Sequence, residues 1–198
     1  MNNLELIRWC ILSRCLYFYP VKKQIGKLIL KRTPEAERKR KGFTLNNAQN
    51  VALIGLIENE MDYSNFVQKI VDVRSNHGVK NVTGIAYVAF KDKNKPSYIN
   101  EEQRDLLVFF KSDLNWKSFP SGEIQKQCNQ SFDLLLDLFG KECTPLEYLW
   151  RTIPASLKVS HQAFPTAEYA DLLANSPSKE PTEVFIAYEE LLTKYDLK

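Results

Sequence analysis

Four carboxylates follow short apolar runs of the chain and have the chemistry that a divalent cation needs. They are Glu58, Glu60, Asp62 and Asp92. Mg²⁺ in proteins binds through one or two carboxylates together with water. Ligands of open parallel sheets bind outside the carboxyl ends of the strands, so acids at strand ends could serve a Mg²⁺-dependent, phosphate-handling enzyme. The alternative is a solvated acidic loop, and no metal or other cofactor is required by this sequence.

A second polar group lies in the stretch FFKSDLNW. It contains Lys111, Asp113, Asn115 and Trp116. Aspartate and asparagine side chains bond readily to nearby backbone N–H groups and so favour turns. A tryptophan here is expected to bury much of its ring and to seek one partner for its N–H. The stretch therefore predicts a structural corner, or a Trp–Asp pair that faces a ligand in a pocket.

His161 is the histidine expected at the carboxyl end of a strand. Its neighbour Ser160 would point to the opposite face of that strand, and the chain has no G-x-S-x-G elbow. The sequence therefore predicts no pair of nucleophile and base, and His161 is either a pocket residue or a histidine whose bonds are structural. We assign no catalytic residue and favour a protein that is not an enzyme.

Nucleotide and zinc sites are not favoured. The segment GLIENEMDYSN has neither a G-x-G-x-x-G nor a Walker pattern, and its carboxylates would repel a phosphate. The chain has seven glycines and four cysteines, and no two cysteines form a C-x-x-C pair. Reduced, buried thiols in a cytoplasmic protein are the simpler interpretation.

These candidate residues depend on elements that we expect from hydrophobic periodicity and capping residues. Strands are expected at 50–57, 82–90, 108–110, 131–139, 156–162 and 168–174. Helices are expected at 62–76, 120–130, 144–153 and 182–196, with a short helical turn at 101–107. This alternation predicts an α/β fold with three layers: a mostly parallel sheet with helices on both faces, flavodoxin-like or Rossmann-like in layout.

Charge divides the chain into a basic helical arm at residues 1–43 and a single α/β domain at residues 44–198. The arm carries 11 Lys or Arg and 3 acids, for a net charge of +8, whereas the remainder carries 16 and 21, for a net charge of −5. Nucleic-acid binding is not favoured because the domain offers no second basic stripe.

An apolar stripe in the arm recurs at helical spacing. Its members are Val21, Ile25, Leu28 and Ile29. The stripe could pack on the domain, or residues 1–41 could lie on an anionic membrane surface.

The apolar run at residues 4–19 does not predict a transmembrane span. Arg8 and Arg14 interrupt it, and a span needs about 20 apolar residues. No small-residue cleavage site follows, so it is also a poor signal peptide. We expect a cytoplasmic protein, with peripheral attachment to the inner face of the membrane as the alternative.

Several pieces, in order, resemble a known family: NVALIGLI, FFKSDLNW, SFDLLLDLF, PLEYLWRTIPASLKVS and VFIAYEELLTKYD. Over residues 20–196 the chain is similar to a family of small, uncharacterised Bacteroidota proteins known as a domain of unknown function. The resemblance implies an α/β fold and no catalytic activity. The leading hypothesis is a non-catalytic binding or interaction module with unknown partners; the magnesium-dependent enzyme and the peripheral membrane protein are the alternatives.

Overall fold

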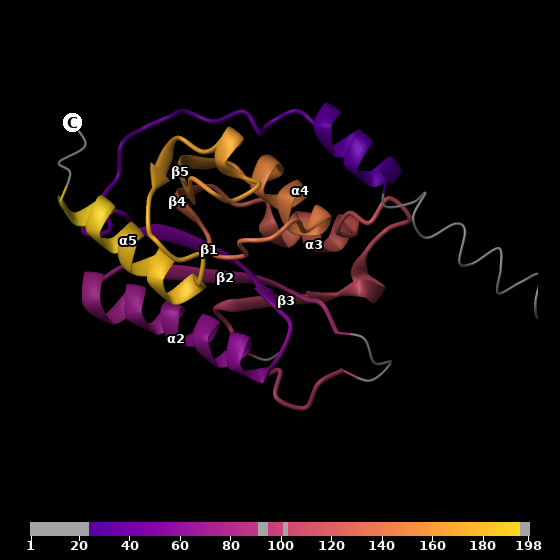
Figure 1. The fold of residues 1–198 in the computed structure, drawn as a ribbon, viewed down its shortest axis with the longest axis horizontal. Helices are drawn as coiled ribbons and strands as arrows, with labels where there is room; N and C mark the ends of the chain where they lie inside the picture. Colours follow the sequence, from indigo (N-terminus) through magenta and orange to yellow (C-terminus); the bar gives the residue numbers. More distant parts are fainter. Residues whose placement is uncertain (1–23, 91–94, 101–102, 195–198) are drawn as a thin grey trace, which may run out of the picture.

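The computed structural model describes residues 24–90, 95–100 and 103–194. Six parallel strands form one sheet with helices on both faces, as predicted (Figure 1). The strands are β1 (Asn50–Ile57), β2 (Asn81–Val88), β3 (Leu106–Phe110), β4 (Phe132–Asp137), β5 (Ala155–His161) and β6 (Leu172–Ala174). The α-helices are α2 (Glu60–His77), α3 (Gly122–Cys128), α4 (Thr144–Thr152) and α5 (Pro181–Lys194), and two short 3₁₀ turns are η1 (Lys111–Asp113) and η2 (Ala167–Tyr169).

The strand order decides between the two predicted layouts. It is β3-β2-β1-β4-β5-β6, which is the order of a Rossmann-like sheet and not of a flavodoxin-like one. The chain first builds outward from β1 through β2 to β3, and then crosses to the other side of β1 to place β4. The topological switch point therefore lies between β1 and β4, and this is where such sheets bind ligands.

Two apolar cores flank the sheet. In Figure 1, α2 and α5 lie on one side of it and α3 and α4 on the other. On the α2 side, Phe66 and Ile70 press against glycines of the central strands. A Cβ added at Gly55 would lie 2.4 Å from the Phe66 ring, and one at Gly84 would lie 2.4 Å from Ile70 Cδ1. These glycines therefore let α2 approach the sheet closely beside the switch point.

Helix α2 begins two residues before its predicted start. Asn59 is the N-cap, and its Oδ1 accepts a hydrogen bond of 2.9 Å from the backbone N–H of Asp62. Asp62 in turn accepts a 2.9 Å bond from the Glu58 N–H. The helix ends at Gly78, whose left-handed φ of 65° suits a glycine. Asp62 thus lies inside the first turn, where its charge complements the helix dipole.

Two other local predictions are corrected. The helical turn expected at 101–107 is wrong at its end, because Leu106 and Leu107 pair with Gly84 and Ile85 as the start of β3. The helix expected over 120–130 is shorter, since α3 spans only Gly122–Cys128.

Residues 24–32 form a helix that packs on the α/β domain (Figure 1, indigo). Leu30 is buried, and a Cβ added at Gly26 would lie 2.6 Å from the carbonyl oxygen of Lys117. Gly26 and Leu30 therefore form the contact face. The packing alternative for the predicted stripe is wrong for Ile25 and Leu28, whose side chains are exposed. Val21 lies outside the described residues.

Candidate functional site

A cleft with a volume of about 430 Å³ lies at the switch point. Its lining residues come from three segments: 55–69, 138–141 and 179–182. They include the end of β1 and the first turns of α2, the loop after β4, and the start of α5. The cleft therefore occupies the position that the strand order predicts for a ligand.

The base of the cleft is apolar. Phe66, Leu138 and Phe139 are buried side chains that contribute to its lining. The loop after β4 turns at Gly140, whose φ of 60° favours glycine, and a Cβ there would lie 3.2 Å from the ring of Phe164. This backbone geometry brings Lys141 to the cleft.

An ion pair joins the two loops that border the cleft. Lys141, after β4, donates to a carboxylate oxygen of Glu58, after β1. The hydrogen bond to Glu58 raises the pKa of Lys141. Both side chains remain largely exposed, so water screens the attraction and the pair opens at little cost. Lys179 and Glu180 add one charge of each sign to the lining.

The four carboxylates predicted as candidate metal ligands do not all lie in the cleft. Glu58 and Asp62 both line the cleft, and Asp62 holds the Glu58 backbone. Glu60 is exposed in the first turn of α2, and Asp92 lies outside the described residues. Within the described ranges, no three side chains of His, Cys, Asp or Glu are grouped closely enough to hold a metal ion.

The SDLNW stretch forms the predicted corner. Asp113 Oδ2 accepts a bond of 2.7 Å from the Phe110 N–H. Asn115 Oδ1 accepts bonds of 2.9 Å from the Lys117 N–H and 3.2 Å from the Phe119 N–H. Phe119 is the residue buried at this corner, and its ring stacks on Tyr148 with centroids 4.4 Å apart.

The prediction that Trp116 buries much of its ring is wrong. Its side chain is 62% exposed, because the turn places Phe119, not Trp116, against the domain. Lys111, at the start of η1, is also exposed. Lys111, Asp113, Asn115 and Trp116 do not line the switch-point cleft.

His161 is buried at the end of β5 as a structural residue. Its Nδ1 lies 3.2 Å from the backbone nitrogen of Ala163. Its Nε2 lies 3.1 Å from the backbone nitrogen and 3.2 Å from the carbonyl oxygen of Ser176. Both ring nitrogens are occupied, and His161 ties residue 176 to the sheet.

Asp137, the last residue of β4, is the most perturbed acid near the cleft. It is fully buried and accepts from the Phe139 N–H at 2.9 Å, from Ser160 Oγ at 3.2 Å and from the Thr166 hydroxyl. Burial raises its pKa to about 6, although these donors favour the charged form. Tyr188 of α5 donates to the Asp137 carbonyl oxygen at 2.8 Å. The group is enclosed by hydrogen-bond partners.

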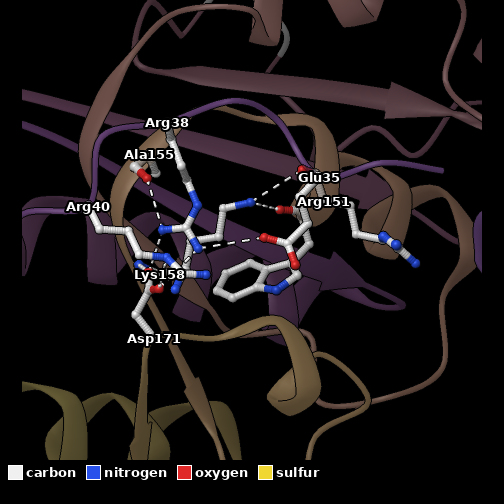
Figure 2. Close-up of polar contacts among 8 residues, drawn as sticks. Glu35, Arg38, Arg40, Arg151, Ala155, Lys158 and Asp171 are labelled. Carbon is white, nitrogen blue, oxygen red and sulfur yellow. Dashed lines mark hydrogen bonds and ion pairs between the residues drawn. The ribbon is translucent and has the colours of Figure 1, made fainter.

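A second buried ionisable group, Lys158, lies in the middle of β5 (Figure 2). Its Nζ donates to the carbonyl oxygens of Trp150 and, at 3.4 Å, Arg151, and so caps the last turn of α4. Burial lowers the pKa of Lys158 to about 8. A lysine inside an apolar strand is the sequence signal for this group.

The segment that follows the arm helix covers this region. Arg38 contacts Asp171 with Nη2 and Oδ1 3.0 Å apart, and donates to the Ala155 carbonyl oxygen at 3.3 Å (Figure 2). The Ala36 N–H donates to the Arg151 carbonyl oxygen at 2.9 Å. These contacts fasten residues 36–38 to α4 and to the amino ends of β5 and β6.

A larger hollow of about 560 Å³ lies at the amino ends of the strands, opposite the cleft. It is lined by polar groups at the amino ends of the strands, where Asn81 donates to Asn50 at 2.8 Å. Arg104 and Asp105 also line it, and Asp105 is paired with Arg74 at 2.9 Å. We favour the smaller cleft because it has an apolar base and lies at the carboxyl edge.

Two further observations bear on the predicted compartment. None of the helices within residues 24–90, 95–100 and 103–194 is long and apolar enough to cross a membrane. Cys128 and Cys143 are buried, and burial raises the pKa of Cys128 to about 12. Cys10 and Cys15 lie outside the described residues. The cytoplasmic assignment stays a prediction.

Comparison with known proteins found one match among family models. The model describes a family of unknown function (DUF6913) and matches residues 19–195. Searches of curated proteins and of solved structures gave no match. The match confirms the predicted resemblance to a family of unknown function, while the bacterial group that we associated with it stays a prediction.

Proposed function

The chain belongs to this family of unknown function, and we propose that the protein is a non-catalytic binding module. Because the family description names no activity, the proposal is argued from the geometry alone. Its ligand site is the cleft between β1 and β4. The ligand class that fits best is a small zwitterion, such as a free amino acid, which carries one cationic and one anionic group.

The Glu58–Lys141 pair is the observation that carries this proposal. A zwitterion can replace both partners at once, since its amine can bind Glu58 and its carboxylate can bind Lys141. A phosphate could satisfy Lys141 but would leave Glu58 beside a like charge, with Asp62 close behind it. A ligand of balanced charge would replace the single Glu58–Lys141 ion pair with two ion pairs to the protein, and its binding is therefore favoured.

The hydrogen bonding of the neighbouring polar groups supports binding over catalysis. Asp137 is enclosed by donors, and Ser160 bonds to Asp137 and to Thr166. His161 uses both ring nitrogens for the backbone. Asp137, Ser160 and His161 each already have structural partners, and none of these three lines the cleft.

A thermal-shift panel tests the proposal. Free amino acids, neutral sugars and nucleoside monophosphates are added separately to the full chain. A zwitterion at about 100 times its dissociation constant should raise the melting temperature by about 5 °C or more. Glu58→Gln and Lys141→Gln should each remove most of that shift. The stability of the two variants alone should change little, because the pair is exposed.

Lys80→Gln is the matched control, because Lys80 is an exposed lysine just before β2, at the opposite edge of the sheet. It should keep the full ligand-induced shift. Ligand recovered after incubation should be chemically unchanged. The proposal is refuted by a panel without any shift, by a shift that survives both cleft variants, or by conversion of the ligand. A nucleotide-specific shift lost in Lys141→Gln would replace the zwitterion with a phosphate.

A further inference from the structure

The switch-point cleft has exposed apolar side chains as well as the Glu58–Lys141 pair. Met61 lines it and is 72% exposed, more than any other large apolar side chain in the part of the chain that the structure describes. Pro181, the first residue of α5, lines the cleft from another segment and is also exposed. Single exposed apolar side chains are common on protein surfaces. These two border one cleft whose base is apolar, so together they offer a surface to a ligand.

Helix α2 places a row of side chains along the cleft. Met61, Asn65 and Lys69 recur every four residues, so they lie on one side of the helix, and all three line the cleft. The buried Phe66 is next to this row and lines the base. Met61 therefore lies on the cleft side of α2, outside the core that the helix buries.

The charges that line the cleft are balanced. They are three acids and three lysines: Glu58, Asp62, Glu180, Lys69, Lys141 and Lys179. Lys69, at the far end of the row, already has partners. Its Nζ lies 3.3 Å from a carboxylate oxygen of Asp72 and 5.1 Å from the centre of the Phe185 ring, and its side chain is only 15% exposed. The part of a zwitterion beyond its amine and carboxylate should therefore be uncharged.

The contact between Glu58 and Lys141 bears on the spacing of the charged groups in the ligand. The ammonium of Lys141 donates directly to the Glu58 carboxylate. A ligand that takes the place of this contact fits best when its own amine and carboxylate lie close together. An α-amino acid carries both groups on one carbon atom, whereas a chain of CH₂ groups separates them in an ω-amino acid. The side chain on that carbon atom can then lie on the apolar part of the cleft.

We propose that the ligand of the cleft is an α-amino acid with a large apolar side chain, such as leucine or phenylalanine, and that Met61 covers this side chain. The inference rests on the proposed zwitterion site and adds the class of side chain that the site accepts. Methionine suits this role, because its unbranched and polarisable side chain adapts to apolar groups of different shape. The cleft volume of about 430 Å³ leaves room for such a side chain beside the two charged groups.

Isothermal titration calorimetry on the full chain tests the preference for an apolar side chain. The ligands are leucine, phenylalanine, glycine, glutamate, lysine and ω-aminohexanoate. Leucine and phenylalanine should bind about tenfold more tightly than glycine, or better, because part of their side chains leaves water. Glutamate, lysine and ω-aminohexanoate should each bind about tenfold more weakly than leucine, since they add a charge or separate the amine from the carboxylate.

Variants of Met61 test its role. Met61→Ser should weaken leucine binding by about threefold or more and leave glycine binding unchanged, because glycine has no side chain to cover. Met61→Leu should keep leucine binding within about twofold of the wild type. Val71→Ser is the matched control, because Val71 is an exposed apolar residue of the same helix that does not line the cleft. It should leave the affinity for both ligands unchanged.

The outcomes separate this inference from the proposed function. Equal affinity for glycine and leucine, or tighter binding of a charged or ω-amino acid, overturns the inference and leaves the zwitterion site in place. Unchanged leucine binding by Met61→Ser, or an equal loss for leucine and glycine, does the same. If none of the amino acids binds, the proposed function fails and the inference fails with it.

Discussion

Asp137→Asn should change how the stability of the protein depends on pH. The carboxyl group is fully buried, and its pKa is raised from 3.8 to about 6. A raised pKa in the folded state means that folding favours the protonated form. The contribution of Asp137 to stability is therefore fully present below about pH 4 and is lost as the pH rises through about 6.

The size of this effect follows from the shift. Each pKa unit corresponds to 1.36 kcal/mol, so a shift of about two units amounts to about 3 kcal/mol. Asparagine has the shape of the protonated carboxyl group. Its oxygen can accept from the Phe139 N–H, and its amide can donate to a hydroxyl of Ser160 or Thr166. Relative to the wild type, Asp137→Asn should thus gain about 3 kcal/mol as the pH rises from about 4 to about 7.

Urea unfolding followed by circular dichroism measures this difference at a series of pH values. Taking the variant minus the wild type cancels the contributions of the other carboxylates. Thr166→Val provides an internal check, because the Thr166 hydroxyl lowers the pKa of Asp137 and its removal should move the titration midpoint upward. A stability difference between Asp137→Asn and the wild type that stays constant from pH 4 to pH 7 would refute the reasoning.

Three further predictions concern packing and charge. Phe66→Ala should reduce the free energy of unfolding by about 3–5 kcal/mol, because the ring fills the space above Gly55, whereas Val71→Ala on the exposed side of α2 should change it by no more than about 0.5 kcal/mol. Lys158 has a pKa lowered from 10.5 to about 8, so the unfolding free energy of the wild type should rise by up to about 3 kcal/mol relative to that of Lys158→Met between about pH 8 and pH 10.5. Urea unfolding of both proteins at the two pH values measures this change, and an unchanged difference would contradict the prediction. Millimolar Mg²⁺ should leave the melting temperature unchanged, because Glu58 is paired with Lys141 and Asp62 accepts from the Glu58 N–H. An increase in melting temperature with Mg²⁺ that Asp62→Asn abolishes would instead favour the metal hypothesis.

The sheet was predictable because periodicity and capping depend on local sequence. The run NVALIGLI became β1 with the predicted bounds, and α4 begins at Thr144, the first residue of the range expected for that helix. The failure at Leu106 and Leu107 has a tertiary cause. Their side chains fit a helical turn or a strand, and pairing with β2 decides in favour of the strand.

The candidate site was predicted only in part, because side-chain type does not determine burial. Glu58 and Asp62 were found from their position after an apolar run, and both line the cleft. Trp116 was expected inside and lies outside, since Phe119 occupies the buried place three residues later. The environment of Lys158 is a tertiary effect, because its Nζ donates to carbonyl oxygens of α4 and the charge of Arg38, far from it in sequence, acts on it only in the folded chain.

The acids that first suggested a metal site have a different role in the fold. Glu60 and Asp62 occupy the first turn of an 18-residue helix, where negative charge is stabilising, and Asp62 also fixes the backbone of Glu58. The helix therefore accounts for these carboxylates without any ligand. What the helix does not account for is Glu58, which lies before its N-cap and reaches across to Lys141. The exposed ion pair, rather than the number of acids, is thus the feature of this strand end on which the proposed ligand site rests.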